Sequence, residues 1–188
     1  MIGYCFCGSF CTVGKSVSVL RTLAAEGNAL LPIMNESVYG TDTRFGKASD
    51  TVKSVEEICK TPVIHTIVDA EPLGPKISLD MLVVAPCTGN TLAKLAAGIT
   101  DSPVTMAVKA HLRSDRPLLI ALASNDAMSA NLKNIGNLLS RKNIYFVPLV
   151  QDDIRTKPHS LVADFSLVPE AAEAAAEGRQ LRPLFLTK

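Results

Sequence analysis

Short apolar runs alternate along the chain with segments in which apolar residues recur every three or four positions. The first pattern is typical of strands buried on both faces of a sheet, and the second of amphipathic helices. Strands that alternate with helices favour parallel βαβ units. We therefore expect an α/β fold with three αβα layers, built on a Rossmann-like (flavodoxin-like) parallel sheet. Its strands are expected at about 1–7, 29–34, 63–67, 80–86, 117–123 and 143–149.

The helical segments are flanked by residues that commonly begin and end helices. Asp50 is placed to cap one helix start, and Thr88 or Asn90 another. Gly98 and Gly178 are placed to end two helices, because glycine readily adopts the left-handed backbone found there. The expected helices span about 11–27, 51–60, 88–98, 102–112, 127–140 and 168–178.

Length and hydropathy favour one domain that associates with copies of itself. The chain has 188 residues, of which 47% are hydrophobic, and it contains no repeat or low-complexity linker. This length suits a single core, so we expect one domain over residues 1–188, with residues 150–188 as an extension that packs on the core. The mean hydropathy is positive, which predicts a homo-oligomer whose protomers cover apolar surface.

Charge and cysteine content exclude several classes of protein. Nineteen basic residues balance eighteen acidic ones without a basic run, so nucleic acid is not an expected partner. The chain has neither a signal-peptide pattern nor a long apolar run, which predicts a cytoplasmic protein without a membrane partner. Five cysteines, an odd number, are expected to be reduced. Cys5, Cys7 and Cys11 lie close together in the sequence. Because no second Cys/His cluster follows at ligand spacing, no metal site is expected.

The segment GSFCTVGKS, residues 8–16, looks like a nucleotide-binding P-loop. A P-loop has four residues between its glycines, whereas Gly8 and Gly14 enclose five. The glycine that the four-residue spacing requires would fall on Ser9, and we therefore do not expect a nucleoside triphosphatase. Lys15 would lie inside the first helix and should face solvent. Gly8 and Ser9 at a helix start suit a single phosphate monoester, because free amides and the helix dipole attract an anion. A simple turn with helix capping is the alternative.

A second polar segment, APCTGNTLAKLAAGITD at residues 85–101, repeats the strand-to-helix arrangement. It carries hydroxyl and amide side chains at Thr88, Asn90 and Thr91. Ligands of open α/β sheets bind at the carboxyl edge of the strands. The segment therefore predicts a polar crevice at the same edge as Gly8, whereas capping alone would explain only one of these side chains.

Both segments resemble the flavoprotein superfamily that includes phosphopantothenoylcysteine decarboxylase and flavin prenyltransferase. Residues 85–101 are similar to its Pro-x-Ser/Thr-x-Asn-Thr-x-x-Lys-x-x-x-Gly-x-x-Asp pattern, and CGSFCT is similar to its Gly-Ser phosphate loop. The resemblance implies bound FMN, with the phosphate at the first loop and the flavin along the second. The matching cofactor-binding residues are Gly8, Ser9, Phe10, Ser37, Pro86, Cys87, Thr88, Asn90, Thr91, Ser124, Asn125 and Met128.

Three other segments, ESVYGTDTRFG, KNIGNLLSRKNIYFVPLVQDD and KPHSLVADFSLVPEA, resemble the family of dipicolinate synthase B subunits. This resemblance implies the small subunit of an oxidoreductase that converts a dihydrodipicolinate-type precursor into pyridine-2,6-dicarboxylate during sporulation. The implied location is the cytoplasm of the bacterial mother cell. The implied partner is the larger A subunit of dipicolinate synthase, which is expected to bind NADP.

Arg44 is the predicted substrate-binding residue. It lies in a long loop with two glycines, a composition suited to a loop that covers a ligand, and its guanidinium can hold a carboxylate in a bidentate manner. The catalytic histidine of the related decarboxylases has no match in EGNALLPIMNESVYG, and no catalytic residue is assigned. The alternative functions are a flavin-free subunit with a structural or activating role, and a stand-alone FMN-dependent decarboxylase.

Overall fold

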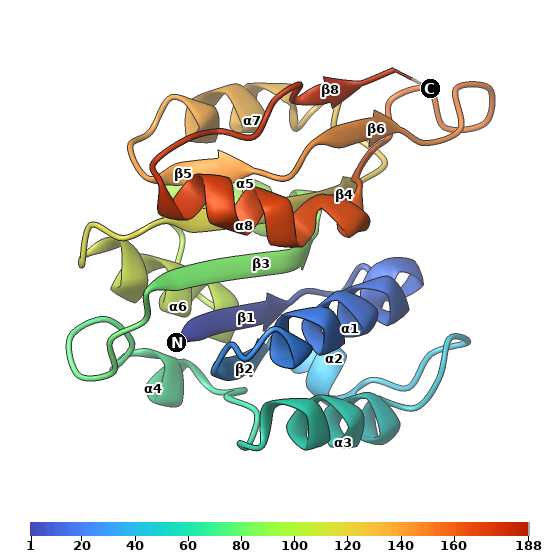
Figure 1. Cartoon of the computed structure of the whole chain (residues 1–188). Coiled ribbons are helices and arrows are strands. Elements are labelled where there is room, and N and C mark those ends of the chain that lie inside the picture. Colours follow the sequence, from blue (N-terminus) through green and yellow to red (C-terminus); the bar gives the residue numbers. More distant parts are fainter. Residues whose placement is uncertain (188) are drawn as a thin grey trace.

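A single sheet of eight strands forms the centre of the protein, whose computed structural model describes residues 1–187. The strand order is β2-β1-β3-β4-β7-β6-β8, and β5 also pairs with β4. Figure 1 shows β1 and β3 running in the same direction through the middle of the molecule. The strands are β1 (Ile2–Phe6), β2 (Leu30–Met34), β3 (Met81–Cys87), β4 (Leu118–Ser124), β5 (Ile144–Phe146), β6 (Leu149–Gln151), β7 (Leu161–Ala163) and β8 (Phe185–Leu186).

Helices cover both faces of this sheet, as Figure 1 shows. Helices α1, α3 and α8 pack on one face, and α4, α5, α6 and α7 lie on the other. The three-layer α/β fold expected from the alternating pattern is therefore confirmed. The helices are α1 (Phe10–Ala25), α2 (Glu36–Gly40), α3 (Ala48–Cys59), α4 (Ile67–Ala70), α5 (Gly89–Ala97), α6 (Pro103–Leu112), α7 (Leu132–Leu139) and α8 (Val168–Ala176), with a 3-10 turn η1 (Phe165–Leu167) before α8.

The central strands are fully apolar because both of their faces are covered. Every residue of β3 and β4 is buried, and β1, β2, β3, β4 and β5 pair in parallel. At about 25 cal/mol per Å² of apolar surface removed from water, such strands supply much of the driving force for folding. Their carboxyl ends meet at one edge of the sheet, where the loops that follow them are brought together.

The segment predicted as a strand at 63–67 makes only one isolated bridge. Ile64 exchanges backbone hydrogen bonds with β2, through Pro32 (2.9 Å) and Met34 (2.8 Å). The hydroxyl of Thr66 then accepts a bond from the amide of Asp69 (3.1 Å) and caps α4. Thr66 thus ends the extended backbone before a strand can form.

The strand expected at 143–149 is divided between β5 and β6. The amide of Val147 still bonds to Ile120 of β4 (2.9 Å), but Pro148 has no amide and cannot continue the ladder. After Pro148 the chain pairs with β7 in the antiparallel direction. The proline therefore redirects the chain from one partner to another.

Two of the expected helix starts are also displaced. The helix expected from 127 begins at Leu132, because the carbonyl of Asp126 accepts the amides of Ser129 (3.1 Å) and Asn131 (3.2 Å) and forms a turn first. Asp50 lies inside α3 and does not cap it: the helix begins at Ala48, whose amide donates to the carboxylate of Asp42 (2.9 Å). The predicted cap by Thr88 and the helix end at Gly98 are confirmed.

The C-terminal segment extends the sheet and makes it mixed rather than wholly parallel. Strand β7 pairs in the antiparallel direction with both β4 and β6. Helix α8 packs against β3, β4 and α1. The last residue of the predicted extension at 150–188 lies outside the described residues. The hairpin between β6 and β7 reaches the carboxyl edge of the central strands.

Candidate functional site

A cavity of about 460 Å³ lies at the carboxyl ends of β1, β3 and β4. The loop before α1, the loop before α5 and the end of β4 form one wall, and the β6–β7 hairpin forms the other. Most of its lining is small or polar. The lining residues are Gly8, Ser9, Cys11, Thr12, Thr88, Gly89, Asn90, Ala123, Ser124, Asn125, Asp126, Asp152, Lys157, Ser160 and Val162.

The N-terminus of α1 presents an anion-binding arrangement. Ser9 occupies the N-cap position, but its side chain does not cap the helix. Its hydroxyl instead accepts a hydrogen bond from the hydroxyl of Thr12 (2.9 Å), so the proton of Ser9 can be donated to a ligand. The amide of Thr12 donates to the carbonyl of Ser9 (2.9 Å), whereas the amides of Phe10 and Cys11 have no partner within the helix. Together with the positive end of the helix dipole, these donors suit a phosphate.

Gly8 brings the other predicted phosphate residues close together. A Cβ atom at Gly8 would lie 3.1 Å from the hydroxyl oxygen of Ser37 and 3.5 Å from the ring of Phe10. Ser37 belongs to α2, which follows β2, and it is exposed. The predicted group of Gly8, Ser9, Phe10 and Ser37 is therefore gathered at one point of the edge, although Phe10 and Ser37 are not part of the cavity lining.

The loop before α5 contributes both lining and structural residues. Thr88 and Asn90 line the cavity. The hydroxyl of Thr88 also accepts the amide of Thr91 (3.1 Å), which caps the helix. Thr91 and Cys87 are buried outside the lining, and so is Pro86. Burial raises the pKa of the Cys87 thiol, so it stays protonated and serves as packing.

A network around Asp126 closes the floor of the cavity. The hydroxyl of Ser124 donates to one carboxylate oxygen of Asp126, and the amide group of Asn131 donates to the other (2.9 Å). These bonds hold the pKa of Asp126 below its usual range, so the carboxylate is charged at neutral pH. A Cβ atom at Gly89 would come within 2.7 Å of both Asp126 and Asn131. Only glycine lets α5 approach this network so closely.

Of the cofactor-binding residues predicted at and after the end of β4, two line the cavity and one does not. Asn125 is exposed and lines the cavity together with Ser124. Met128 does not line it, and its amide instead donates to the carbonyl of His159 in the hairpin (2.9 Å). Asp126 was not predicted, although an aspartate in the loop just after a buried strand is a signal that could have identified it.

The β6–β7 hairpin adds charged residues that the sequence motifs did not indicate. Asp152, Lys157 and Ser160 line the cavity. The ammonium nitrogen of Lys157 lies 2.9 Å from a carboxylate oxygen of Asp152. No local pattern could have placed them here, because antiparallel pairing of β7 with β4 brings the hairpin to the cavity.

The predicted substrate residue Arg44 lies away from this cavity. It is exposed in the loop after α2, and its guanidinium carbon lies 4.9 Å from the centre of the Phe45 ring. Phe45 borders a second cavity, of about 500 Å³, between this loop, α1 and α3. Arg44 itself lines neither cavity, although Phe10, one of the residues predicted to bind the cofactor, lines the second one.

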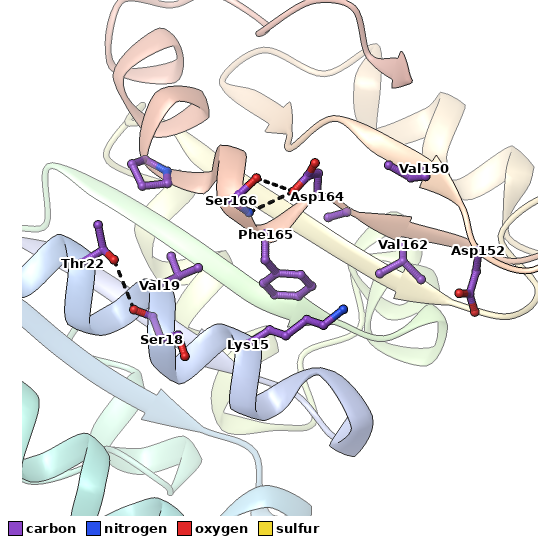
Figure 2. A pocket seen from close by; sticks show the side chains of 12 residues that line it. Lys15, Ser18, Val19, Thr22, Val150, Asp152, Val162, Asp164, Phe165 and Ser166 are labelled. Carbon is purple, nitrogen blue, oxygen red and sulfur yellow. Dashed lines mark hydrogen bonds between the residues drawn. The ribbon is translucent and has the colours of Figure 1, made fainter. Parts of the chain in front are cut away.

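A larger cavity, of about 650 Å³, lies between α1 and the C-terminal elements. Figure 2 shows Lys15 extending from α1 beside Phe165, with Asp152 across the opening. Its apolar wall includes Val19 and Val162. None of the predicted cofactor residues lines it. Lys15 is exposed as expected, which agrees with its place inside α1 rather than in a phosphate loop.

No histidine lines the 460 Å³ cavity at the strand ends in the part of the chain that the structure describes. His111 is buried, bonds through Nε2 to the carbonyl of Pro117 (2.9 Å), and has its pKa lowered by burial. His65 stacks on Tyr39. Over residues 1–187 there is no group of three or more His, Cys, Asp or Glu side chains that could hold a metal ion, and no helix there is long and apolar enough to span a membrane.

Comparison with known proteins places these features in a wider context. The model of the family described as Flavoprotein matches residues 47–164. The chain is 43% identical over 185 residues to the dipicolinate synthase B subunit of Bacillus subtilis, a match that covers 98% of this chain and 92% of that protein. The crystal structure of the dipicolinate synthase B subunit from Bacillus halodurans matches with a TM-score of 0.91 and 40% identity, over 100% of this chain and 96% of that one.

A more distant structure shares the fold. The FMN-dependent cysteine decarboxylase SpaF matches with a TM-score of 0.68 and 23% identity, over 93% of this chain and 96% of that chain. The similarity to the two Bacillus proteins spans both walls of the cavity, the strand ends as well as the hairpin.

Proposed function

Because the chain belongs to the flavoprotein family and, within it, to the dipicolinate synthase B subunits, we propose that it binds FMN as the small subunit of an oxidoreductase. The reaction would convert a dihydrodipicolinate-type precursor into pyridine-2,6-dicarboxylate during sporulation. The partner would be the larger A subunit of the same enzyme, which would bind NADP.

The observation that carries this proposal is the donor set at the start of α1. Gly8 leaves room for a ligand beside Ser37, and Ser9 keeps a hydroxyl proton available because it accepts from Thr12 instead of capping the helix. These groups could hold one phosphate through neutral donors and the helix dipole. The residues present therefore fit the phosphate end of FMN, and we call the 460 Å³ cavity that they line the phosphate cavity.

The rest of the cavity suits the polar rim of a flavin. Asn90 and Asn125 offer amide donors and acceptors, and Ser124 lies beside them. A flavin requires a few well-placed polar groups around an otherwise apolar surface. Bound FMN would supply an acceptor for the two electrons that leave the precursor as its ring becomes aromatic. The protein would hold the flavin in place and orient it towards the substrate.

Arg44 remains our candidate for binding a carboxylate of the substrate. It is exposed, and its loop, cyan in Figure 1, projects beside the start of α1. A guanidinium with free donors can bind a carboxylate through two parallel bonds. In this proposal the loop would meet the substrate when the small and large subunits are assembled.

We further propose that the protein forms homo-oligomers in the cytoplasm of the mother cell. Phe45, Ile154 and Phe185 are large apolar side chains exposed at the surface. Their exposure supports association with another protein surface, since large exposed apolar side chains are commonly covered when chains associate. Sedimentation of the purified chain would test the homo-oligomer, which would be rejected by a purely monomeric species.

Titration with FMN tests the central proposal. The purified chain should bind FMN and shift its visible absorption. Ser9→Asp should weaken binding by more than about 100-fold, because a carboxylate would face the phosphate at close range. Ser18→Asp is a matched control, since Ser18 lies on the exposed side of α1 outside the phosphate cavity. Equal FMN affinity of Ser9→Asp and the unmodified protein would contradict the proposed site.

A second candidate function is that of a flavin-free activator of the large subunit. The cavity contains two carboxylates, Asp126 and Asp152, which oppose the binding of an anion. If the chain binds no FMN at high micromolar concentration but still activates the large subunit, this second function holds. The stand-alone decarboxylase is less well supported, because no histidine is among the described residues that line the cavity.

A further inference from the structure

Lys157 is the one cationic side chain among the described residues that line the phosphate cavity. It comes from the β6–β7 hairpin, whereas the phosphate donors come from α1. The cavity also contains the carboxylates of Asp126 and Asp152. A doubly charged phosphate would therefore meet more negative than positive charge unless Lys157 turned towards it.

The hairpin holds the backbone of Lys157 in a defined place. The amide of Lys157 donates to the carbonyl of Asp153 (2.7 Å), and its own carbonyl accepts the amide of Ser160 (3.0 Å). Asp153 forms the turn, since its carboxylate accepts the amides of Arg155 (2.9 Å) and Thr156 (3.1 Å). The backbone is fixed while the long side chain remains free to change partner.

The partner of Lys157 in the structure is Asp152. The two side chains are 56% and 38% exposed, and exposed ion pairs contribute little stability. Asp152 raises the pKa of Lys157, and Lys157 lines the same cavity as Ser9 and Cys11 at the start of α1. The ammonium group therefore lies within electrostatic range of the helix start, and a pair as weak as this can be broken by a stronger anion.

We propose that Lys157 leaves Asp152 and binds the phosphate of FMN at the start of α1, so that Asp152 acts as a competitor that limits the affinity. This inference rests on the proposed FMN-binding function. It assigns the hairpin a role in distinguishing phosphorylated from unphosphorylated flavin, because riboflavin has the same ring and no phosphate.

Paired titrations with FMN and riboflavin test this role. Lys157→Gln should weaken FMN binding about tenfold, the size of one charge-assisted hydrogen bond, and should leave riboflavin binding within about twofold. Asp152→Asn should strengthen FMN binding about threefold by releasing Lys157 and removing a negative charge. Lys157→Arg should restore most of the FMN preference, since it keeps the charge.

Arg155→Gln is the matched control. Arg155 lies in the same hairpin and has the same charge, but it does not line the cavity. Arg155→Gln should leave the ratio of FMN to riboflavin affinity unchanged. If this ratio fell as much as it does in Lys157→Gln, the effect would come from the overall charge of the hairpin and the proposed contact would be rejected. Raised ionic strength should weaken FMN binding to the unmodified protein more than binding to Lys157→Gln.

Two other outcomes separate this inference from the function on which it rests. If the unmodified protein binds FMN and Lys157→Gln keeps the same FMN-to-riboflavin ratio, the inference is overturned and the proposed function stands. If the unmodified protein binds no FMN, both are overturned. Circular dichroism of each variant establishes that it is folded before the titrations are compared.

Discussion

The two walls of the phosphate cavity are built in different ways. One wall follows the parallel strands β1, β3 and β4 and presents helix amides and small neutral side chains, with Asp126 as its charged member. The other is the β6–β7 hairpin, whose strands have three residues each and whose connecting loop presents Asp152 and Lys157. The first is rigid because its strands are buried, and the second is exposed. Shape therefore comes from the first wall and adjustable charge from the second.

The largest expected effect tests the rigidity of the strand wall. Gly89→Ala would place a Cβ atom against the Asp126 network, on which Ser124 and Asn131 also converge. We expect the free energy of unfolding to fall by about 2–3 kcal/mol, as for overpacked sites. Urea unfolding measures this loss.

Gly136→Ala provides the control for that substitution. Gly136 lies inside α7, and a Cβ atom there would meet nothing within 4 Å. Alanine should stabilise this helix by up to about 1 kcal/mol. If both variants shifted the unfolding midpoint in the same direction, the close approach of Gly89 to the Asp126 network would not be the reason that glycine is needed there.

The loop after α2 is a second exposed segment that can supply charge, through Arg44, as the hairpin does through Lys157. In the proposed two-subunit enzyme, Arg44→Lys should raise the KM for the dicarboxylate substrate about five- to tenfold, because lysine cannot form the bidentate contact. FMN affinity should not change, since Arg44 lies outside the phosphate cavity. Steady-state kinetics with the large subunit present measure the effect, and an unchanged KM would remove Arg44 from the substrate site.

Asp126 is the charged member of the strand wall and should respond to pH. Its folded pKa is lowered, chiefly by the bond from Ser124 and also by Asn131. Its contribution is therefore fully present above the unfolded pKa of about 3.9 and is lost as pH falls through the lower folded value. Asp126→Asn should cost about 1 kcal/mol at pH 7 and less at pH 3. Urea unfolding at both pH values measures this, and an equal loss at both would show that the charge is not involved.

The smallest effect on stability is expected in the hairpin wall. Asp153→Ala removes the turn acceptor for Arg155 and Thr156 and should lower global stability by less than about 0.5 kcal/mol, because the turn is exposed. Amide hydrogen exchange should nevertheless become faster in residues 152–160. A large global loss with unchanged local exchange would mean that the hairpin folds as part of the rigid wall.

Prediction from sequence succeeded where one segment carries its own signal. The apolar runs that became β1, β3 and β4 are buried on both faces, and Thr88 and Gly98 bound α5 as expected. Prediction was wrong where a single polar residue or a proline redirected the chain. Thr66 ended the extended segment after its single bridge at Ile64, and Pro148 divided one expected strand into two.

The candidate site shows the same division. Gly8, Ser9, Thr88 and Asn90 could be selected from short motifs because each lies within about three residues of the end of a buried strand. Their role in binding FMN stays a prediction. The segment GSFCTVGKS is explained by packing beyond its first residues, since Ser16 is buried and donates to the carbonyl of Ala85 (2.5 Å).

The sequence by itself determined which runs must be buried, and hence the α/β layers and the edge where the polar loops meet, because burial of apolar side chains follows local periodicity. Only the tertiary structure decided that Asp152 and Lys157 face that edge. Their position depends on the pairing of β7 with β4, in which Val162 lies opposite Ala123. No local pattern encodes contacts between segments so far apart in the chain.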